Sequence, residues 1–227
     1  MRAAQFCTSC GRLQPAVPTD YFAFFGLPHK LNIDTAALER EMYTLSRRLH
    51  PDLYVRATSQ EQLWSLEQSS MLNDAYRTLR DPIERTEYLL KLEGVELEEQ
   101  SKQATEKARA TGELKKQVVP PDLLEEVFEL NMQLEELKAN KKVGEGDPDL
   151  TRDLKQAKAG FEGKLSEIGN ELEKRWAEWD AVIGREQAGE SVPDEERRRV
   201  RDKMVDVLNR RSYIRNLVRD VNAALAE

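Results

Sequence analysis

The sequence predicts an all-α protein built from two helical domains. Apolar residues recur three and four positions apart along most of its 227 residues, which is the period of an amphipathic helix. Proline and glycine separate these stretches, and no segment has a clear strand pattern. The composition, 39% hydrophobic and 34% charged with few aromatic residues, is also typical of helices with charged surfaces rather than of a sheet protein.

Charge and hydropathy argue against several classes of protein. The formal net charge of −7 is unlike that of a dedicated nucleic-acid-binding protein, which usually carries a basic excess. No run of about 18 apolar residues is present, so we expect no transmembrane helix and no membrane partner. The N-terminus lacks the apolar core of a signal peptide, and two cysteines cannot supply a disulfide framework. We therefore expect a cytoplasmic protein.

Four helices are expected in the first domain, residues 19–94, after a cysteine-containing tail, residues 1–18. A threonine or aspartate can cap the short helix DYFAFF, which a glycine and a proline end. The second helix opens at Asp34 or Thr35, and four apolar residues share one of its faces: Leu38, Met42, Leu45 and Leu49. Because Pro51 disfavours helical dihedral angles at the residue before it, this helix should end near Leu49 or His50.

The third and fourth helices complete this domain. The third begins at Ser59, and its clearest apolar patch comprises Leu72, Ala75, Tyr76 and Leu79. Asp81 is expected to cap the fourth helix, with Pro82 in its first turn and Glu84 as a capping-box acid. The fourth helix should stop at Gly94.

A polar linker or weak helix, residues 95–120, leads to a second domain, residues 121–227. Three longer helices are expected there, over about 121–141, about 149–184 and the segment after Pro193. The apolar face of the second comprises Leu150, Leu154, Ala157, Phe161, Leu165, Ile168, Leu172, Trp176, Trp179 and Ile183. The stripe of the third comprises Val200, Met204, Val207, Arg211, Ile214, Val218, Val221 and Leu225. Such stripes predict a three-helix antiparallel bundle.

The tripeptide His50-Pro51-Asp52 stands at the end of the second helix. A simple helix stop explains the proline and the aspartate, but it does not require the histidine, which is one of only two in the chain. Its surroundings are more informative. The tripeptide follows two arginines, lies between two amphipathic helices, and comes after DYFAFFGL and before NDAYRTLRDP and ERTEYLL.

These segments, in this order and at this spacing, resemble a J-domain. J-domains bind ATP-loaded chaperones of the seventy-kilodalton heat-shock class and stimulate their ATPase. The resemblance implies that His50, Pro51 and Asp52 form the stimulating loop. It also implies a positive steering face on the second helix, made by Arg47, Arg48 and Arg40. Physically, exposed arginines speed encounter with an acidic surface, and a rigid polar loop adds a stereospecific contact.

The chain as a whole resembles the HscB family, J-type co-chaperones of iron–sulfur cluster biogenesis. It lacks the Gly/Phe-rich linker and the zinc repeats of DnaJ-type proteins, and it has the extra apolar run EYLLKLEGVEL before a helical C-terminal domain. The likeness extends from about Asp20 to the C-terminus and is weaker after Gly94. It implies an HscA- or DnaK-type chaperone and an IscU-type scaffold as partners, the scaffold being held by the C-terminal bundle.

The first helix of the second domain carries two apolar rows. One alternates by three and four residues as a bundle core does: Leu123, Val127, Leu130, Leu134 and Leu137. The other is turned about 100° from it and comprises Leu124, Phe128 and Met132. Two interpretations remain open. Either this helix is buried over a wide face, or the second row is an exposed docking patch rimmed by Glu125, Glu129 and Glu136.

The HscB resemblance favours the docking patch. In that family this surface combines apolar residues with glutamates, and the matching positions here are Leu124, Phe128, Glu129 and Glu136. The chain departs from the family pattern with Met132 where an acid is frequent and with Glu125 where a methionine occurs. An aromatic residue of the last helix also contributes in the family. Tyr213 matches it and lies off the apolar stripe, so we expect it to be exposed.

The tail sequence FCTSCGR places Cys7 and Cys10 on one tight turn. This is half of a zinc knuckle, since structural zinc takes four cysteine or histidine ligands, and His29 is a third candidate without a spacing argument. Some HscB relatives carry two such pairs ahead of the J-domain. The pair therefore either binds zinc across a dimer, is completed by residues upstream of this sequence, or binds no metal; a redox motif is a further reading without a neighbouring βαβ pattern.

Other functional classes have less support. The sequence has no phosphate-binding loop and no nucleophile–histidine constellation, so we do not expect an enzyme. The alternative function is a general J-domain co-chaperone that delivers unfolded clients. A structural adaptor with a silent J-like domain is a third possibility, against which the intact His-Pro-Asp tripeptide argues.

Overall fold

The computed structural model describes residues 5–95, 97, 119–142 and 146–226 of the chain. Within these ranges all regular elements are helices, and the sole β feature is an isolated antiparallel bridge between Phe6 and Leu13. The predicted all-α class is therefore confirmed. Most of the expected linker, residues 95–120, lies outside the described residues. In the described part of the chain, no helix combines the length and the apolar character that crossing a membrane requires.

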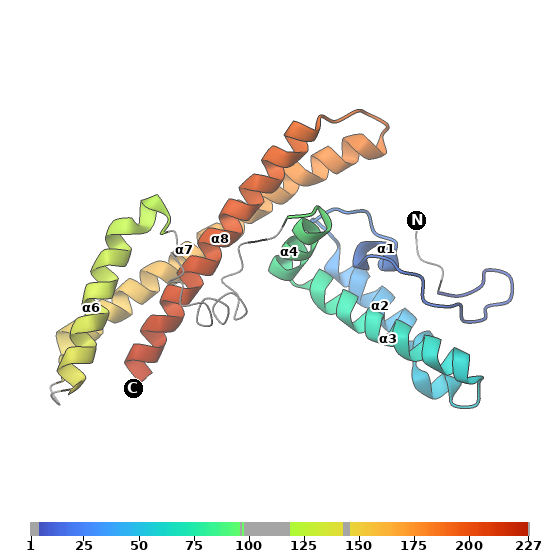
Figure 1. The fold of residues 1–227 in the computed structure, drawn as a ribbon, viewed down its shortest axis with the longest axis horizontal. Helices are drawn as coiled ribbons and strands as arrows, with labels where there is room; N and C mark the ends of the chain where they lie inside the picture. The colour runs from blue at the N-terminus through green and yellow to red at the C-terminus, as the bar shows by residue number, and fades with distance from the viewer. Residues whose placement is uncertain (1–4, 96, 98–118, 143–145, 227) are drawn as a thin grey trace, which may run out of the picture. The chain divides into compact units, whose positions relative to one another are not determined.

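The chain divides into two compact units, which are described in turn. The first combines residues 1–95 with the segment 176–200. Its helices are α1 (Tyr21–Phe25), α2 (Thr35–Leu49), the short 3₁₀ helix η1 (Pro51–Tyr54), α3 (Ser59–Arg80) and α4 (Pro82–Leu92). The long helices α2 and α3 lie side by side as a hairpin (Figure 1).

Side chains just before each helix satisfy its first N–H groups. Asp20, Asp34 and Asp81 accept hydrogen bonds from backbone N–H groups at the starts of α1, α2 and α4. A full capping box occurs before α3, where Thr58 and Glu61 bond each other's backbone N–H groups. The sequence predicted a capping box at α4 instead. There Asp81 is the cap, and it accepts hydrogen bonds from the N–H groups of Ile83 and Glu84. These caps fix where each helix of the hairpin begins.

A distant segment of the chain completes the first unit. Trp179 is fully buried, and its indole N–H donates to the carbonyl of His29 at 2.8 Å. The carboxylate of Asp180 accepts from the backbone N–H groups of Leu31 and Asn32 at 2.7 and 2.9 Å. Arg197 forms a hydrogen-bonded ion pair with Glu93. Residues some 150 positions apart are thereby packed together.

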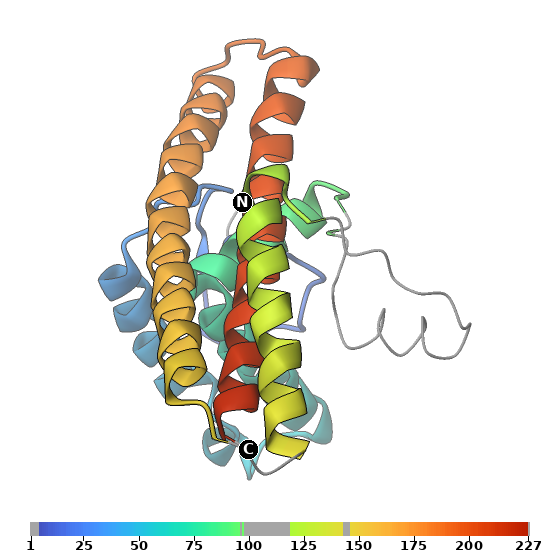
Figure 2. The same ribbon diagram turned by 90° about the vertical axis from the view of Figure 1, so that its left-hand side faces the viewer.

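The second unit is a bundle of three helices. It contains η2 (Pro121–Leu123), α6 (Leu124–Lys142), α7 (Pro148–Gln187) as far as Arg175, and α8 (Asp194–Ala226) from Arg201 onward. Figure 2 shows α6 running alongside α7 and α8. Ion pairs join the same helices: Lys164 of α7 reaches Glu126, and Arg210 of α8 reaches Asp122 at the start of α6.

The core of this bundle follows the predicted seam of α6. All five seam residues are at most 8% exposed: Leu123, Val127, Leu130, Leu134 and Leu137. Leu154 and Phe161 of α7 are also buried, as are Ile214 and Val221 of α8. The predicted three-helix arrangement is therefore confirmed.

Candidate functional site

The His-Pro-Asp loop, His50 to Asp52, lies directly after α2. His50 has an extended ψ of 129°, as expected for a residue before proline, and its N–H still donates to the carbonyl of Ser46. Pro51 begins η1, so the chain turns sharply without leaving the surface. The His50 side chain is 56% exposed and that of Asp52 is 85% exposed. Both polar groups are open to a partner.

Hydrogen bonds within the loop orient its histidine. The backbone N–H of Asp52 donates to Nδ1 of His50 at 3.3 Å, and the Asp52 carboxylate lies 3.5 Å from the same nitrogen. An Nδ1 that accepts this bond leaves Nε2 as the proton-bearing nitrogen of the neutral ring. The loop therefore offers one N–H donor and one carboxylate in a defined arrangement.

Side chains from two other elements fix the end of α2 beneath this loop. The last carbonyls of a helix have no partner within it. Here the carbonyl of Leu49 accepts hydrogen bonds from the hydroxyls of Ser65 and Ser69 on α3, at 2.6 and 2.9 Å. The carbonyl of Arg48 accepts from the hydroxyl of Tyr54 in η1 at 3.0 Å. Sequence reasoning missed these hydroxyl groups because no local pattern marks a serine as a cap for a distant helix.

The steering face predicted on α2 is exposed. Arg47 and Arg48 lie in the last turn of the helix, next to the loop, and Arg40 lies two turns earlier with its side chain 71% exposed. Arg40 is 3.9 Å from the Asp34 carboxylate, a loose surface pair that leaves its guanidinium available. Three positive groups and the His-Pro-Asp loop thus lie along one helix.

The second predicted surface lies on α6 and is also exposed. Leu124, Phe128 and Met132 are 60%, 68% and 59% exposed, although the first two directly follow buried residues of the seam. We call these three residues the apolar row. Four-residue spacing keeps them on one side of the helix. The interpretation of α6 as buried over a wide face is therefore wrong, since the three helices bury only the seam.

Glutamates surround the apolar row. Glu125, Glu129 and Glu136 are all exposed, as the docking hypothesis requires. Glu126, in contrast, is paired with Lys164 of α7 and belongs to the bundle. The surface is therefore an apolar strip bordered by carboxylates, which suits a partner with an apolar contact and basic residues around it.

Tyr213 does not belong to this exposed surface, and the prediction that it is exposed was wrong. Its side chain is only 5% exposed, and burial raises the pKa of its phenol. The predicted stripe was too narrow for a helix that lies against both α6 and α7 (Figure 2). Two further residues outside the predicted stripe are buried as well, Leu208 and Leu217.

Residues 5–14 form a small hairpin rather than a free tail; we call it the N-terminal hairpin. Its two arms are joined through Cys7, whose N–H donates to the carbonyl of Arg12, and through Gln14, whose N–H donates to the carbonyl of Gln5. Gly11 takes a φ of 69° at the turn, a conformation that favours glycine. Phe6, which sequence reasoning did not single out, packs its ring against Arg48 of the steering face.

The two cysteines lie together on this turn. The N–H groups of Cys10 and Ser9 point at the Cys7 sulfur and lower the pKa of its thiol. Within the described residues, no group of three or more His, Cys, Asp or Glu side chains is placed to hold a metal ion. His29, the suggested third ligand, has its Nε2 3.2 Å from the Asp20 carboxylate. Two thiols do not make a four-ligand zinc site, so these residues alone do not fit one.

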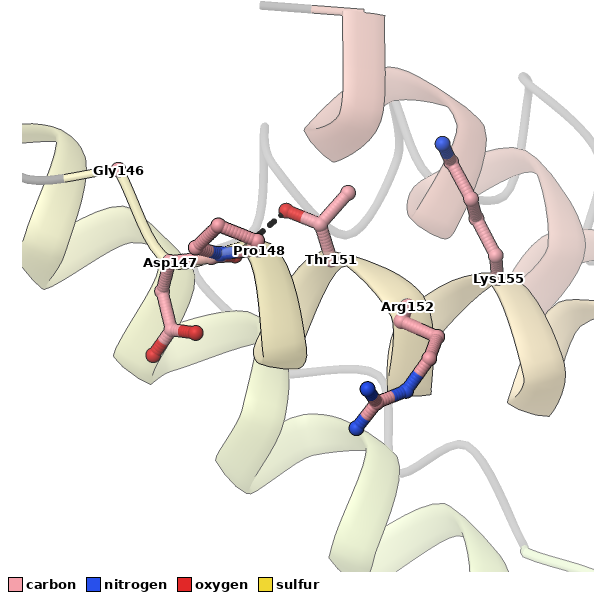
Figure 3. Close-up of a pocket in the computed structure, with 6 residues that line it drawn as sticks. All are labelled: Gly146, Asp147, Pro148, Thr151, Arg152 and Lys155. Atoms are coloured by element: carbon pink, nitrogen blue, oxygen red, sulfur yellow. Dashed lines mark hydrogen bonds between the residues drawn. The ribbon is translucent and has the colours of Figure 1, made fainter.

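A surface depression at the start of α7 has a local structural explanation. Figure 3 shows its six lining residues: Gly146, Asp147, Pro148, Thr151, Arg152 and Lys155. Asp147 accepts hydrogen bonds from the N–H groups of Asp149 and Leu150, and its carbonyl accepts from the Thr151 hydroxyl. This is the N-terminal cap of α7.

Comparison with known proteins places this fold. No family model matches the chain. Two solved structures are similar to it over most of its length. The crystal structure of the human co-chaperone protein HscB covers 98% of this chain and 91% of its own, with 23% identity and a TM-score of 0.60. The chaperone HscB from Vibrio cholerae covers 90% of this chain and 96% of its own, with 24% identity and a TM-score of 0.51. The chain thus has the all-α HscB fold.

Proposed function

We propose that this chain is a J-domain co-chaperone of iron–sulfur cluster assembly. Its first unit stimulates the ATPase of an HscA- or DnaK-type chaperone, and its second unit binds an IscU-type scaffold and presents it for cluster transfer. The fold shared with two HscB co-chaperones supports this assignment. The observation that carries it is the exposed His-Pro-Asp loop, fixed at the end of a basic helix face.

The two parts of the first surface have different roles in this proposal. The arginines of α2 raise the rate of encounter with an acidic chaperone surface, because long-range attraction acts before contact. The His-Pro-Asp loop then makes the stereospecific contact, with its histidine N–H and aspartate carboxylate held in a fixed geometry. Increasing salt is expected to weaken the first effect more than the second.

The apolar row favours a folded scaffold, rather than any unfolded client, as the partner of the second unit. Three large exposed side chains on a rigid helix face can fit a complementary surface of a folded partner. Binding of many different unfolded chains favours adaptable surfaces instead. The carboxylates around the row add charge selection. With Tyr213 buried, the scaffold-binding set that we propose is Leu124, Phe128, Glu129, Met132 and Glu136.

The first test changes the loop. We expect His50→Gln to reduce stimulation of a DnaK-type ATPase to background, because the exposed imidazole contributes to the contact and not to the core. Single-turnover ATP hydrolysis measures this, and circular dichroism checks that the fold is kept. The matched control is His29→Gln at the other histidine, which should retain stimulation. Unchanged stimulation by the His50 variant contradicts the role of the loop.

The second test changes the apolar row. We expect Leu124→Ala with Phe128→Ala to weaken binding of an IscU-type scaffold by about 10- to 100-fold, the loss typical of two interface anchors. Isothermal calorimetry measures the affinity. ATPase stimulation without scaffold should be unchanged. Leu63→Ala with Leu66→Ala removes two other exposed leucines, from α3, and is the control.

Competition separates the two candidate functions. If a permanently unfolded polypeptide displaces the scaffold at similar concentrations, general client delivery is favoured over scaffold delivery. Equal scaffold affinity for the wild type and the Leu124/Phe128 variant rejects the apolar row as the binding surface.

A further inference from the structure

The N-terminal hairpin is attached to the first unit by contacts that do not involve Phe6. Gln5 is buried, and its side-chain amide donates to the carbonyl of Phe24 at 3.0 Å. Leu13 is 3% exposed, and the side-chain amide of Gln68 on α3 donates to the carbonyl of Gln14. These anchors are sufficient to hold the hairpin in place.

Phe6 makes a contact of a different kind. Its half-buried ring lies under the guanidinium of Arg48, with the carbon of the guanidinium 3.8 Å from the ring centroid. This is a cation–π contact at close range, between the hairpin and the last turn of α2. The ring therefore packs on a charged group of the steering face.

Arg48 is consequently held at both ends. Phe6 restrains its guanidinium, while Tyr54, two residues beyond the His-Pro-Asp loop, bonds its carbonyl at 3.0 Å. Its neighbour Arg47 is also exposed, yet among the described residues no aromatic ring covers its guanidinium. The two adjacent arginines thus differ in how far they are ordered before a partner arrives.

We propose that Phe6 is a positioning residue that fixes Arg48 for the chaperone encounter, so that the N-terminal hairpin is a working part of the chaperone-binding face. This inference rests on the proposed function of the first unit. An arginine that is already ordered loses less side-chain freedom on binding, and a planar guanidinium keeps its N–H edges available while its face rests on a ring. Phe6 acts through Arg48 and makes no contact with the chaperone in this scheme.

The experiment compares three side chains at position 6 in the full-length protein. Phe6→Leu keeps an apolar group of similar size but has no aromatic ring. Phe6→Trp keeps an aromatic ring, and one that binds cations more strongly. The concentration of each variant that gives half-maximal stimulation of a DnaK-type ATPase is measured. We expect Phe6→Leu to raise it about two- to fivefold with the maximum unchanged, and Phe6→Trp to match the wild type.

Two arginine backgrounds identify the residue through which Phe6 acts. In an Arg48→Gln background, Phe6→Leu should have no further effect, because the group that it positions is gone. In the matched Arg47→Gln background, the full two- to fivefold effect should remain. A purely structural hairpin would give the same loss in both backgrounds.

The outcomes separate the two proposals. Equal half-maximal concentrations for the wild type and Phe6→Leu, or equal losses in both arginine backgrounds, overturn the positioning role and leave the proposed function standing. Absence of any stimulation by the wild-type chain overturns the proposed function, and the positioning role with it.

Discussion

At the scale of single residues, the end of α2 depends on hydroxyl groups contributed from elsewhere. Ser65 is fully buried, and with Ser69 it satisfies the carbonyl of Leu49. A buried carbonyl without a partner is more costly than a lost hydrogen bond, because the desolvation of the group is then not offset. These two serines therefore stabilise the turn that contains His50.

We predict that the two serines are coupled. Ser65→Ala alone should lower the free energy of unfolding by about 1 kcal/mol, because Ser69 still reaches the carbonyl. Adding Ser69→Ala should cost more than the sum of the single changes, since the carbonyl then has no partner. Urea denaturation measures these values, and the exposed Ser70→Ala is the control. Strict additivity would argue against a shared acceptor.

The candidate residues were predictable from the sequence to different degrees. The His-Pro-Asp tripeptide is contiguous, and proline and the preceding extended residue are local effects, so both the turn and its exposure follow from sequence alone. The exposure of Leu124, Phe128 and Met132 was one of two open readings, because a helix pattern does not say how many neighbours the helix has. Phe6 carries no local signal, since its partner Arg48 is far along the chain.

At the scale of elements, helix starts were predicted from the sequence more accurately than the buried faces of helices. Caps are local: Asp81 was predicted outright, and Asp20 and Asp34 were each one of two candidates at their helix starts. Helix α3 begins at Ser59, as predicted, but its cap was not predicted, although Thr58 and Glu61 have the spacing of a capping box. The predicted buried face of α8 was too narrow. Because α8 packs in a bundle with α6 and α7, its buried face extends to Tyr213.

The capping box of α3 should give a pH-dependent stability. Hydrogen bonds from Thr58 lower the pKa of Glu61 below its ordinary value, so its charged form is favoured in the folded state. A carboxyl group with a lowered folded-state pKa stabilises the fold above its unfolded pKa, and this contribution disappears as the pH falls through the folded value. Glu61→Gln should therefore be less stable than the wild type above about pH 5 and equally stable in strong acid.

Thermal unfolding between acidic and neutral pH checks this prediction. Glu67→Gln removes a carboxylate from the exposed side of the same helix and serves as the control. A constant difference between wild type and Glu61→Gln at all pH values would show that the glutamate acts only through its shape. Thr58→Ala should cost about 1 kcal/mol at neutral pH by removal of the cap itself.

At the scale of the whole molecule, sequence order and spatial grouping do not coincide. Helices α7 and α8 each continue from one compact unit into the other, with the changes at Arg175 and Val200. The apolar stripe of α7 runs from Leu150 to Ile183 without interruption. Nothing in its period reveals that Trp176 and Trp179 pack in a different unit from Phe161, because both environments are apolar.

We predict that Trp179 stabilises the first unit specifically. Trp179→Phe leaves a cavity and removes the N–H partner of the His29 carbonyl, so it should lower the stability of this unit by about 2–4 kcal/mol. Hydrogen exchange should show lost protection in α2 and α3, with α6 little changed. Trp64→Phe, at a half-buried position of α3, is the control and should cost less. Equal loss of protection in α6 would contradict a unit-specific role.

The late segment of the first unit also matters while the protein is being made. Trp179 and Asp180 contact the backbone at His29 and Leu31, but they are translated about 100 residues after α3 ends at Arg80. At typical elongation rates of about 5–20 residues per second, that interval is roughly 5–20 s. During it the residues around Leu31, which is fully buried in the finished unit, lack the segment that covers them. A protein that we propose to assist other chains would thus itself present a binding site for chaperones while it is being synthesised.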